Sequence, residues 1–327
     1  MITDTGFNEL KDIMAYLDKV PYCVTRKSLY TAQELYDGYM AGNEYRYSSC
    51  YDGRVYQYYQ YTGTQDPGVE ESLARSLHDH GIHMALRHFM DQHEPLRCVG
   101  VMGGHALPRT DKIWHDIALL SKRLTEQGFV MLSGGGPGAM EGTHLGAWMA
   151  GRTSAEMEEA IAMLTPAPSF KDERWLPTAF SVIKRYPRQQ QYVSLGIPTW
   201  LYGHEPSTPF ATHIAKFFEN SIREDSILTL AYGGLIYTPG SAGTMQEIFQ
   251  EAVQNHYLSF GFASPMVFMG KDFWTQEIPV YPLLQQLVQT GRYKNLQLTL
   301  TDDIDEIIEV LAAFAIQSSH TSHTSHT

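Results

Sequence analysis

The chain alternates short apolar runs with longer segments in which apolar residues recur every three or four positions. The apolar runs lie at 96–102, 129–142, 191–203, 233–240 and 264–270. Helical periodicity is present over 112–128, at about 139–150 and over 212–231. Strands that alternate with helices predict an α/β fold, in which a mostly parallel, doubly wound sheet carries helices on both faces.

Residues 1–95 differ from this pattern and predict a mainly helical N-terminal extension. Helical spacing is present at 7–18, 32–40 and 68–92. The stretch 45–61 contains seven tyrosines, and its Asp52-Gly53 dipeptide predicts a hairpin turn. Such an aromatic cluster could stack on a base, but we expect it to pack as an accessory layer.

Two further segments interrupt the alternation. Residues 151–190 read as an insertion into a domain that spans 96–317, with a helix at 156–164 and a proline-rich part at 165–191. We expect this insertion to lie beside a site, as a lid would. The tail 318–327 repeats Ser, His and Thr, has nothing to bury, and is predicted to be disordered.

Composition and charge narrow the class of protein. The 327 residues are 43% hydrophobic and 18% charged, which is typical of a soluble globular protein. A net charge of −12 argues against a nucleic-acid polymer as partner, because phosphate backbones bind basic surfaces. No apolar run is long enough to span a membrane. Cys23, Cys50 and Cys98 have neither zinc nor disulfide spacing, so we expect a cytoplasmic protein.

Three glycine-containing loops follow predicted strands, at 103–109, 133–141 and 238–247, and the last two open into helices. The first amides of a helix lack internal partners, and glycine lets an oxyanion approach them closely. The loops therefore predict a phosphate site. Its candidate residues are Gly103, Gly104, Ser133, Gly134, Gly135, Gly136, Gly138, Met140, Gly240, Ser241, Ala242, Gly243 and Thr244.

Two common nucleotide motifs do not match. Gly134, Gly136 and Ala139 have the dinucleotide spacing, but alanine stands at the last position and no clear acidic ribose partner ends the next strand. A nicotinamide-dependent oxidoreductase is therefore a weaker alternative. No lysine follows Gly138 as a P-loop requires, which argues against triphosphate hydrolysis.

The loops "GGGPGAM" and "PGSAGTMQE" together resemble those of the LONELY GUY, or "lysine decarboxylase-like", phosphoribohydrolase family. The resemblance covers about residues 96–310 and is nearer the larger bacterial members, which include nucleotide 5′-monophosphate nucleosidases. It implies a modified Rossmann fold, usually as a homodimer. It also implies hydrolysis of the N-glycosidic bond of a nucleoside 5′-monophosphate, with Glu247 and Arg223 as catalytic residues. No setting for a pyridoxal phosphate lysine is recognisable, so no cofactor is expected.

The chain departs from the family pattern at two positions. Arg223-Glu224 stands where the family usually has Arg-Lys, and Ser241 stands where glycine is usual. These departures keep a second hypothesis open, in which the same fold is a non-catalytic nucleotide-binding sensor.

Several other polar residues lie near the predicted strand ends. His105 and Arg109 are candidates for base or phosphate contact, and Glu141 begins a helix where it contacts the nucleotide or stabilises the helix dipole. His204, with Glu205, follows another strand and is a candidate for the pocket wall. These residues lack metal-ligand spacing, so no metal is expected. Thr244 and Glu247 have the spacing of a capping box, which would fix the carboxylate.

Overall fold

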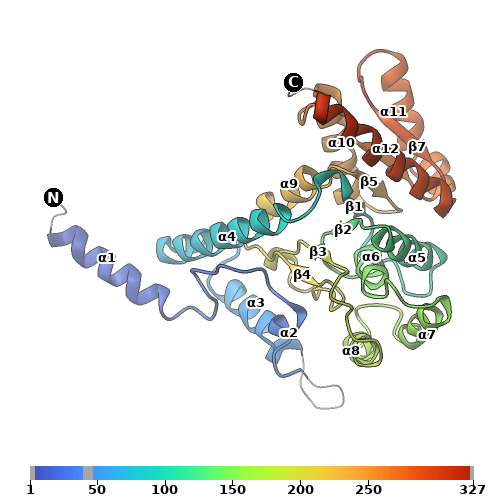
Figure 1. The fold of residues 1–327 in the computed structure, drawn as a ribbon. Helices are drawn as coiled ribbons and strands as arrows, with labels where there is room; N and C mark the ends of the chain where they lie inside the picture. Colours follow the sequence, from blue (N-terminus) through green and yellow to red (C-terminus); the bar gives the residue numbers. More distant parts are fainter. Residues whose placement is uncertain (1–3, 40–46, 325–327) are drawn as a thin grey trace.

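The computed structural model describes the backbone of residues 4–39 and 47–324 (Figure 1). The helices are α1 (Asp4–Leu17), α2 (Ala32–Leu35), α3 (Tyr51–Tyr61), α4 (Val69–Met90), α5 (Lys112–Glu126), α6 (Ala139–Trp148), α7 (Ser154–Leu164), α8 (Trp175–Arg185), α9 (Asn220–Leu230), α10 (Ala242–Tyr257), α11 (Val280–Gln289) and α12 (Ile304–Thr324). The strands are β1 (Cys98–Met102), β2 (Val130–Ser133), β3 (Ser194–Gly196), β4 (His213–Ile214), β5 (Gly234–Tyr237), β6 (Pro265–Phe268) and β7 (Gln297–Leu300).

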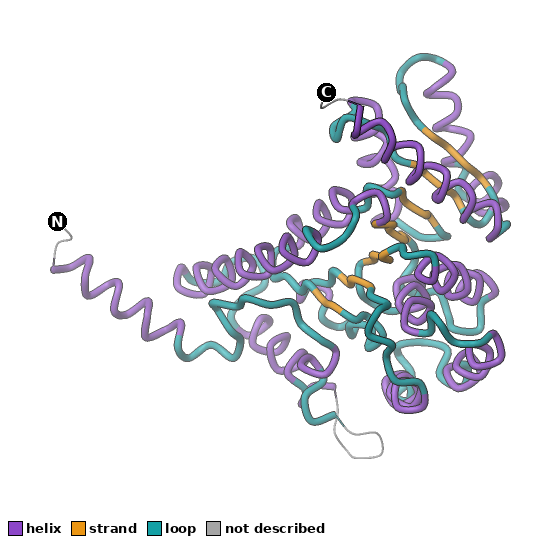
Figure 2. The backbone as a smooth tube through the Cα atoms, in the orientation of Figure 1, coloured by secondary structure: helices purple, strands orange, loops and turns teal. Residues whose placement is uncertain are grey.

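All seven strands pair in parallel in one sheet of order β4-β3-β2-β1-β5-β6-β7 (Figure 2). The predicted parallel α/β sheet is therefore confirmed. The chain starts at the centre with β1, moves outward to β4, and then returns to place β5 on the other side of β1. A ligand crevice is expected at the carboxyl ends of β1 and β5, where the strand order reverses.

Both faces of the sheet are covered, because alternate side chains of each strand point to opposite sides. Val99 and Val101 of β1 lie in the apolar cluster that contains residues of α5, α6 and α12. Cys98 and Met102 lie in the cluster that contains residues of α4, α9 and α10. The sheet is thus doubly wound, as the alternating pattern predicts.

The N-terminal extension packs into the core of the sheet domain, while α1 projects from it (Figure 1). Asp52 of α3 forms a fully buried ion pair with Lys216, and the indole of Trp200 donates to the same carboxylate at 2.9 Å. Tyr30 forms an antiparallel bridge with Ile214 of the edge strand β4. The extension therefore covers an edge that would otherwise expose unpaired backbone groups.

The tyrosine-rich segment does not form the predicted hairpin. Asp52 and Gly53 lie inside the first turn of α3, and Val55 and Tyr59 are buried with helical spacing. A Cβ at Gly53 would overlap the carbonyl oxygen of Tyr47, so close backbone packing accounts for the glycine. Tertiary contacts of Asp52 thus outweigh the turn preference of the dipeptide.

The predicted helix over 212–231 is wrong in its first half. Residues 213–214 form β4, and α9 begins only at Asn220. The buried carboxylate of Asp79, on α4, accepts hydrogen bonds from the amides of Phe218 and Glu219. Glu219 caps α9 by accepting from the amide of Ser221. These bonds set the helix start three residues before Arg223.

Helix α12 continues through Thr324 and so includes the described part of the tail, 318–324. Extending an existing helix costs less than nucleating one, and the polar repeat follows an apolar helical segment directly. Residues 325–327 lie outside the described residues.

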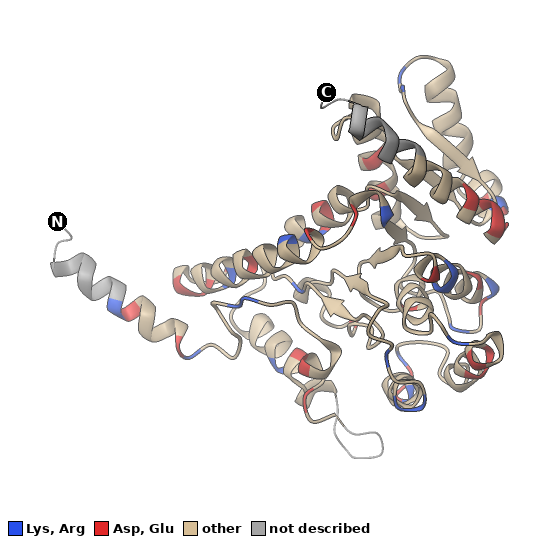
Figure 3. Cartoon of the chain, viewed as in Figure 1, with Lys and Arg blue, Asp and Glu red and all other residues tan. Residues whose placement is uncertain are grey.

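Figure 3 shows acidic and basic residues interspersed along the helices.

Candidate functional site

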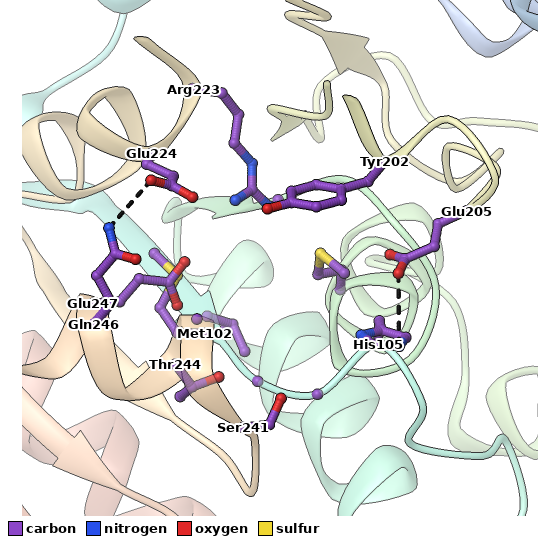
Figure 4. Close-up of a pocket in the computed structure, with 16 residues that line it drawn as sticks. Met102, His105, Tyr202, Glu205, Arg223, Glu224, Ser241, Thr244, Gln246 and Glu247 are labelled. Carbon is purple, nitrogen blue, oxygen red and sulfur yellow. Dashed lines mark hydrogen bonds and ion pairs between the residues drawn. The ribbon is translucent and has the colours of Figure 1, made fainter. Parts of the chain in front are cut away.

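A pocket of about 250 Å³ lies where the loops after β1 and β5 face each other (Figure 4). The predicted residues that line it are Gly103, Gly104, His105, Gly134, Met140, Arg223, Ser241, Gly243, Thr244 and Glu247. The fold therefore brings together residues from all three glycine loops and from α9 at the predicted crevice.

Backbone contacts hold the three loops against one another. The amide of Gly104 donates to the carbonyl of Pro239 at 3.0 Å, and the amide of Ala139 donates to the carbonyl of Gly104 at 3.2 Å. Gly138 has φ 70°, and a Cβ there would overlap the carbonyl oxygens of Gly104 and His105. Gly138 is thus required for the close approach of two loops.

Arg223 enters the pocket from the first turns of α9 (Figure 4). Its Nε donates to the carbonyl of Ile197 at 3.0 Å, which fixes the guanidinium group. A Cβ at Gly134 would overlap the Nη2 atom of Arg223 and would stand 2.7 Å from the sulfur of Met140. The glycine therefore provides the space that the guanidinium group occupies.

Glu247 enters the same pocket from α10. Burial raises the pKa of its carboxyl to about 7, the charge of Arg223 lowers it in part, and the charge of Glu224 raises it further. Such a carboxyl is poised to accept or release a proton near neutral pH. A perturbed carboxyl in a cleft is also a common mark of a functional site.

Glu224 follows Arg223 and is held on both oxygens. Asn220 donates to one oxygen at 2.6 Å and Gln246 donates to the other at 3.1 Å. Glu224 thus lines the pocket as a fixed negative charge close to Glu247.

His105, Tyr202 and Glu205 form the side of the pocket opposite Glu247 (Figure 4). The Nε2 of His105 lies 3.6 Å from Oε1 of Glu205, and the Nε2 of His204 lies 3.7 Å from the same oxygen. The ring of His105 lies 6.1 Å from that of Phe170, in the predicted insertion. Phe170 therefore lies next to a residue that lines the pocket.

The predicted capping box of Thr244 and Glu247 is wrong. Helix α10 begins at Ala242, its N-cap residue is Ser241, and no side chain caps it. Thr244 is therefore the third residue of the helix and Glu247 lies in its second turn. The helix therefore begins three residues earlier than the capping-box spacing predicts. The first amides of α10, those of Ala242, Gly243 and Thr244, remain at a helix start without a side-chain cap.

Several predicted residues lie outside the pocket lining: Ser133, Gly135, Gly136, Gly138, Gly240, Ala242, Arg109, Glu141 and His204. The hydroxyl of Ser133 bonds to Nε2 of His144 at 2.8 Å and accepts from the amide of Gly135 at 3.1 Å. Burial lowers the pKa of His144 to about 3, so its ring is neutral. Ser133 and Gly135 therefore form hydrogen bonds within the protein and do not line the pocket.

Arg109 and Glu141 form a buried ion pair beneath the insertion. The Nε of Arg109 donates to Glu141 at 2.9 Å, and its Nη1 donates to the hydroxyl of Thr178 on α8 at 2.8 Å. Arg109 also donates to the carbonyls of Ala167 and Trp175. The pair thus anchors the insertion to the loop that follows β1.

Other lining residues were not among the candidates from the sequence: Val101, Met102, Tyr202, Glu224 and Gln246. Val101 and Met102 end β1 and read as core residues. Tyr202 ends the 3₁₀ turn Trp200–Tyr202, next to His204, so its place after a strand is the signal that could have found it. Gln246 is a helix residue with no distinctive motif.

Among the described residues, no group of three or more His, Cys, Asp or Glu side chains is arranged to hold a metal ion. Within the same part of the chain, no helix is long and apolar enough to cross a membrane.

No protein-family model matches the chain, and no curated protein matches it. Solved structures with a similar fold include the molybdenum cofactor binding protein of Rippkaea orientalis, with 16% identity and a TM-score of 0.41 over 66% of this chain and 95% of that one. The molybdenum cofactor carrier protein of Chlamydomonas reinhardtii has 16% identity and a TM-score of 0.38 over 66% and 97%. TM1055 has 18% identity and a TM-score of 0.42 over 66% and 98%. At these TM-scores the likeness says nothing about activity.

Proposed function

We propose that this protein hydrolyses the N-glycosidic bond of a nucleoside 5′-monophosphate and releases the free base and ribose 5-phosphate. The observation that carries the proposal is Glu247, whose carboxyl has a pKa raised to about 7 and shares the crevice pocket with Arg223. The resemblance of the two glycine loops to the phosphoribohydrolase family points to the same reaction.

Glu247 has the chemistry that this hydrolysis needs. As the C1′–N bond breaks, its electron pair leaves with the base and C1′ gains oxocarbenium character, which an ionised carboxylate stabilises. Water adds to C1′ and passes a proton to Glu247, while the base takes up a proton from solvent. Glu247 then returns its proton to solvent, so the enzyme is regenerated.

The phosphate would be held mainly by backbone amides. The basic side chains in the described pocket lining are Arg223 and His105, and Glu205, Glu224 and Glu247 oppose them. Helix-start amides at Gly243 and Thr244 bind an oxyanion without a lysine.

The size of the pocket fits part of a nucleotide, with the rest of the substrate outside the cavity. A volume of about 250 Å³ lies below the roughly 300–1,000 Å³ that usually encloses a drug-sized ligand. Ribose phosphate would fill it, with the base extending toward the exposed ring of Tyr202.

The direct test is incubation of the folded protein with AMP, GMP, IMP, CMP and UMP, with free base followed by chromatography. The proposal expects base release from at least one of them, in step with ribose 5-phosphate. A folded protein that releases no base from any would overturn it.

A second candidate is a nucleotide-binding protein without turnover. Glu224 favours it, because this fixed negative charge stands where the resembled family usually has lysine and raises the pKa of Glu247. Calorimetry that finds tight binding of a monophosphate, together with no base release, would support this candidate over the first.

A further inference from the structure

The far side of the pocket contains a carboxylate that the hydrolysis itself does not use. The side chain of Glu205 lines the pocket with only 16% of its surface exposed. Its Oε1 lies within 3.7 Å of the imidazoles of His105 and His204. Among the described residues, none donates a hydrogen bond to either oxygen. Both oxygens are therefore available to accept hydrogen bonds from a ligand in the pocket.

The glycine loop after β2 lies next to the second carboxylate oxygen of Glu205, Oε2. A Cβ at Gly136 would stand 3.9 Å from Oε2 of Glu205, so Oε2 lies over the glycine loop while Oε1 faces the imidazoles. Glu205 comes from the loop after β3 and Glu247 from α10, and they lie on opposite sides of the pocket (Figure 4). A ribose at Glu247 would therefore direct its base toward Glu205.

An ionised carboxylate only accepts hydrogen bonds, and its two oxygens match two adjacent N–H donors. Guanine presents such a pair on its Watson–Crick edge, at N1 and the 2-amino group. Adenine and cytosine pair one amino donor with a ring-nitrogen acceptor, which a carboxylate repels. Uracil and hypoxanthine each offer one ring N–H.

We infer that Glu205 is the base-recognising residue of this site and that the substrate is a guanine nucleoside 5′-monophosphate. This inference rests on the proposed function for the position of the ribose. The exposed ring of Tyr202 would add a stacking surface beside the base. His105 and His204 would act as positioning residues that hold one carboxylate oxygen.

The test compares kcat/KM for GMP, IMP, AMP, CMP and UMP in the wild type and in Glu205→Gln. A lost bidentate pair typically corresponds to ~1–3 kcal/mol, so we expect the wild type to prefer GMP over AMP by about 5- to 150-fold. IMP should fall between them. Glu205→Gln offers one donor and one acceptor, so the preference should shift toward AMP and CMP.

Glu158→Gln is the matched control, because Glu158 is an exposed carboxylate on α7 outside the pocket, and it should leave the ratio unchanged. Glu205→Ala should lose the GMP preference without gaining AMP. Base release without GMP preference in the wild type, or an unchanged GMP-to-AMP ratio in Glu205→Gln, would overturn the inference and leave the hydrolase intact.

If no nucleotide is hydrolysed, the proposed function fails. The dissociation constants of GMP and AMP are then compared by calorimetry. Tighter binding of GMP that is lost in Glu205→Gln would still support recognition by Glu205. Equal binding of GMP and AMP, or no binding of either, would overturn it.

Discussion

Gly134 and Arg223 fit together across the site: the missing side chain of Gly134 leaves the space that Nη2 of Arg223 occupies. Gly134 directly follows β2, and Arg223 lies on α9, 89 positions later in the chain. The glycine loop thus has a second role besides offering amides, because it sets the position of the guanidinium group.

Substitution Gly134→Ala should displace Arg223, because its Cβ would overlap the guanidinium group. Misplacing such a group by about 1 Å can lower turnover on the order of 100-fold, and we expect a loss of this size in base release. Gly68→Ala, immediately before α4, is the control, because a Cβ there would meet only Oε2 of Glu70 at 3.7 Å, and it should retain activity. Wild-type turnover in Gly134→Ala would show that Arg223 has no such dependence.

Glu224→Gln should shift the pH dependence of hydrolysis. The Glu224 charge raises the pKa of Glu247, which must be ionised to accept a proton, so the rate should fall as the pH drops through about 7. Removing the Glu224 charge lowers that pKa and moves the acidic limb of kcat/KM to lower pH. An acidic limb that stays in place, or moves upward, would contradict the assignment of this limb to Glu247.

Glu251 makes a prediction about stability. Burial raises the pKa of its carboxyl from 4.5 to about 7 in the folded state. Between these pH values the unfolded chain ionises while the folded protein does not, so Glu251 favours unfolding by up to about 3 kcal/mol as the pH rises to 7. Glu251→Gln should therefore flatten the fall of the unfolding free energy between pH 4.5 and 7. Urea titrations that give the same pH dependence of the unfolding free energy for both proteins would refute this.

The Asp52–Lys216 ion pair should be needed for docking of the N-terminal extension. Lys216→Met leaves the carboxylate of Asp52 buried without its cation, which typically costs ~3–5 kcal/mol. Lys112→Met removes a solvent-exposed partner of Asp116 and should cost under about 1 kcal/mol. Adding Asp52→Asn to Lys216→Met should recover stability. Thermal unfolding measures all three, and equal effects of Lys216→Met and Lys112→Met would contradict the structural role.

Much of the fold was predictable from the sequence, because apolar runs mark strands and the glycine turns after them mark where those strands end. Strands β1, β2, β3, β5 and β6 lie within the five predicted runs, and the loops after β1 and β5 meet as expected for parallel strands. Strand β4 has only two residues, and β7 has the partly buried pattern of an edge, so neither gives a strong apolar signal.

The errors arise where long-range contacts outweigh local preference. Asp52 reads as a turn residue, yet its bonds to Trp200 and Lys216 hold it in a helix. Thr244 reads as a cap, yet the turn before it already starts α10 at Ala242. Tyr202 belongs to no motif, and its place after a strand is the one signal that pointed to the pocket.

The central claim is that Glu247 carries hydrolysis of a nucleoside monophosphate. The measurement that tests it most directly is the rate of base release by the wild type and by Glu247→Gln, with circular dichroism to show that both are folded. We expect wild-type turnover and a loss of about 10²–10⁴-fold in Glu247→Gln, with the nucleotide still bound. Equal rates in the two folded proteins would contradict the claim.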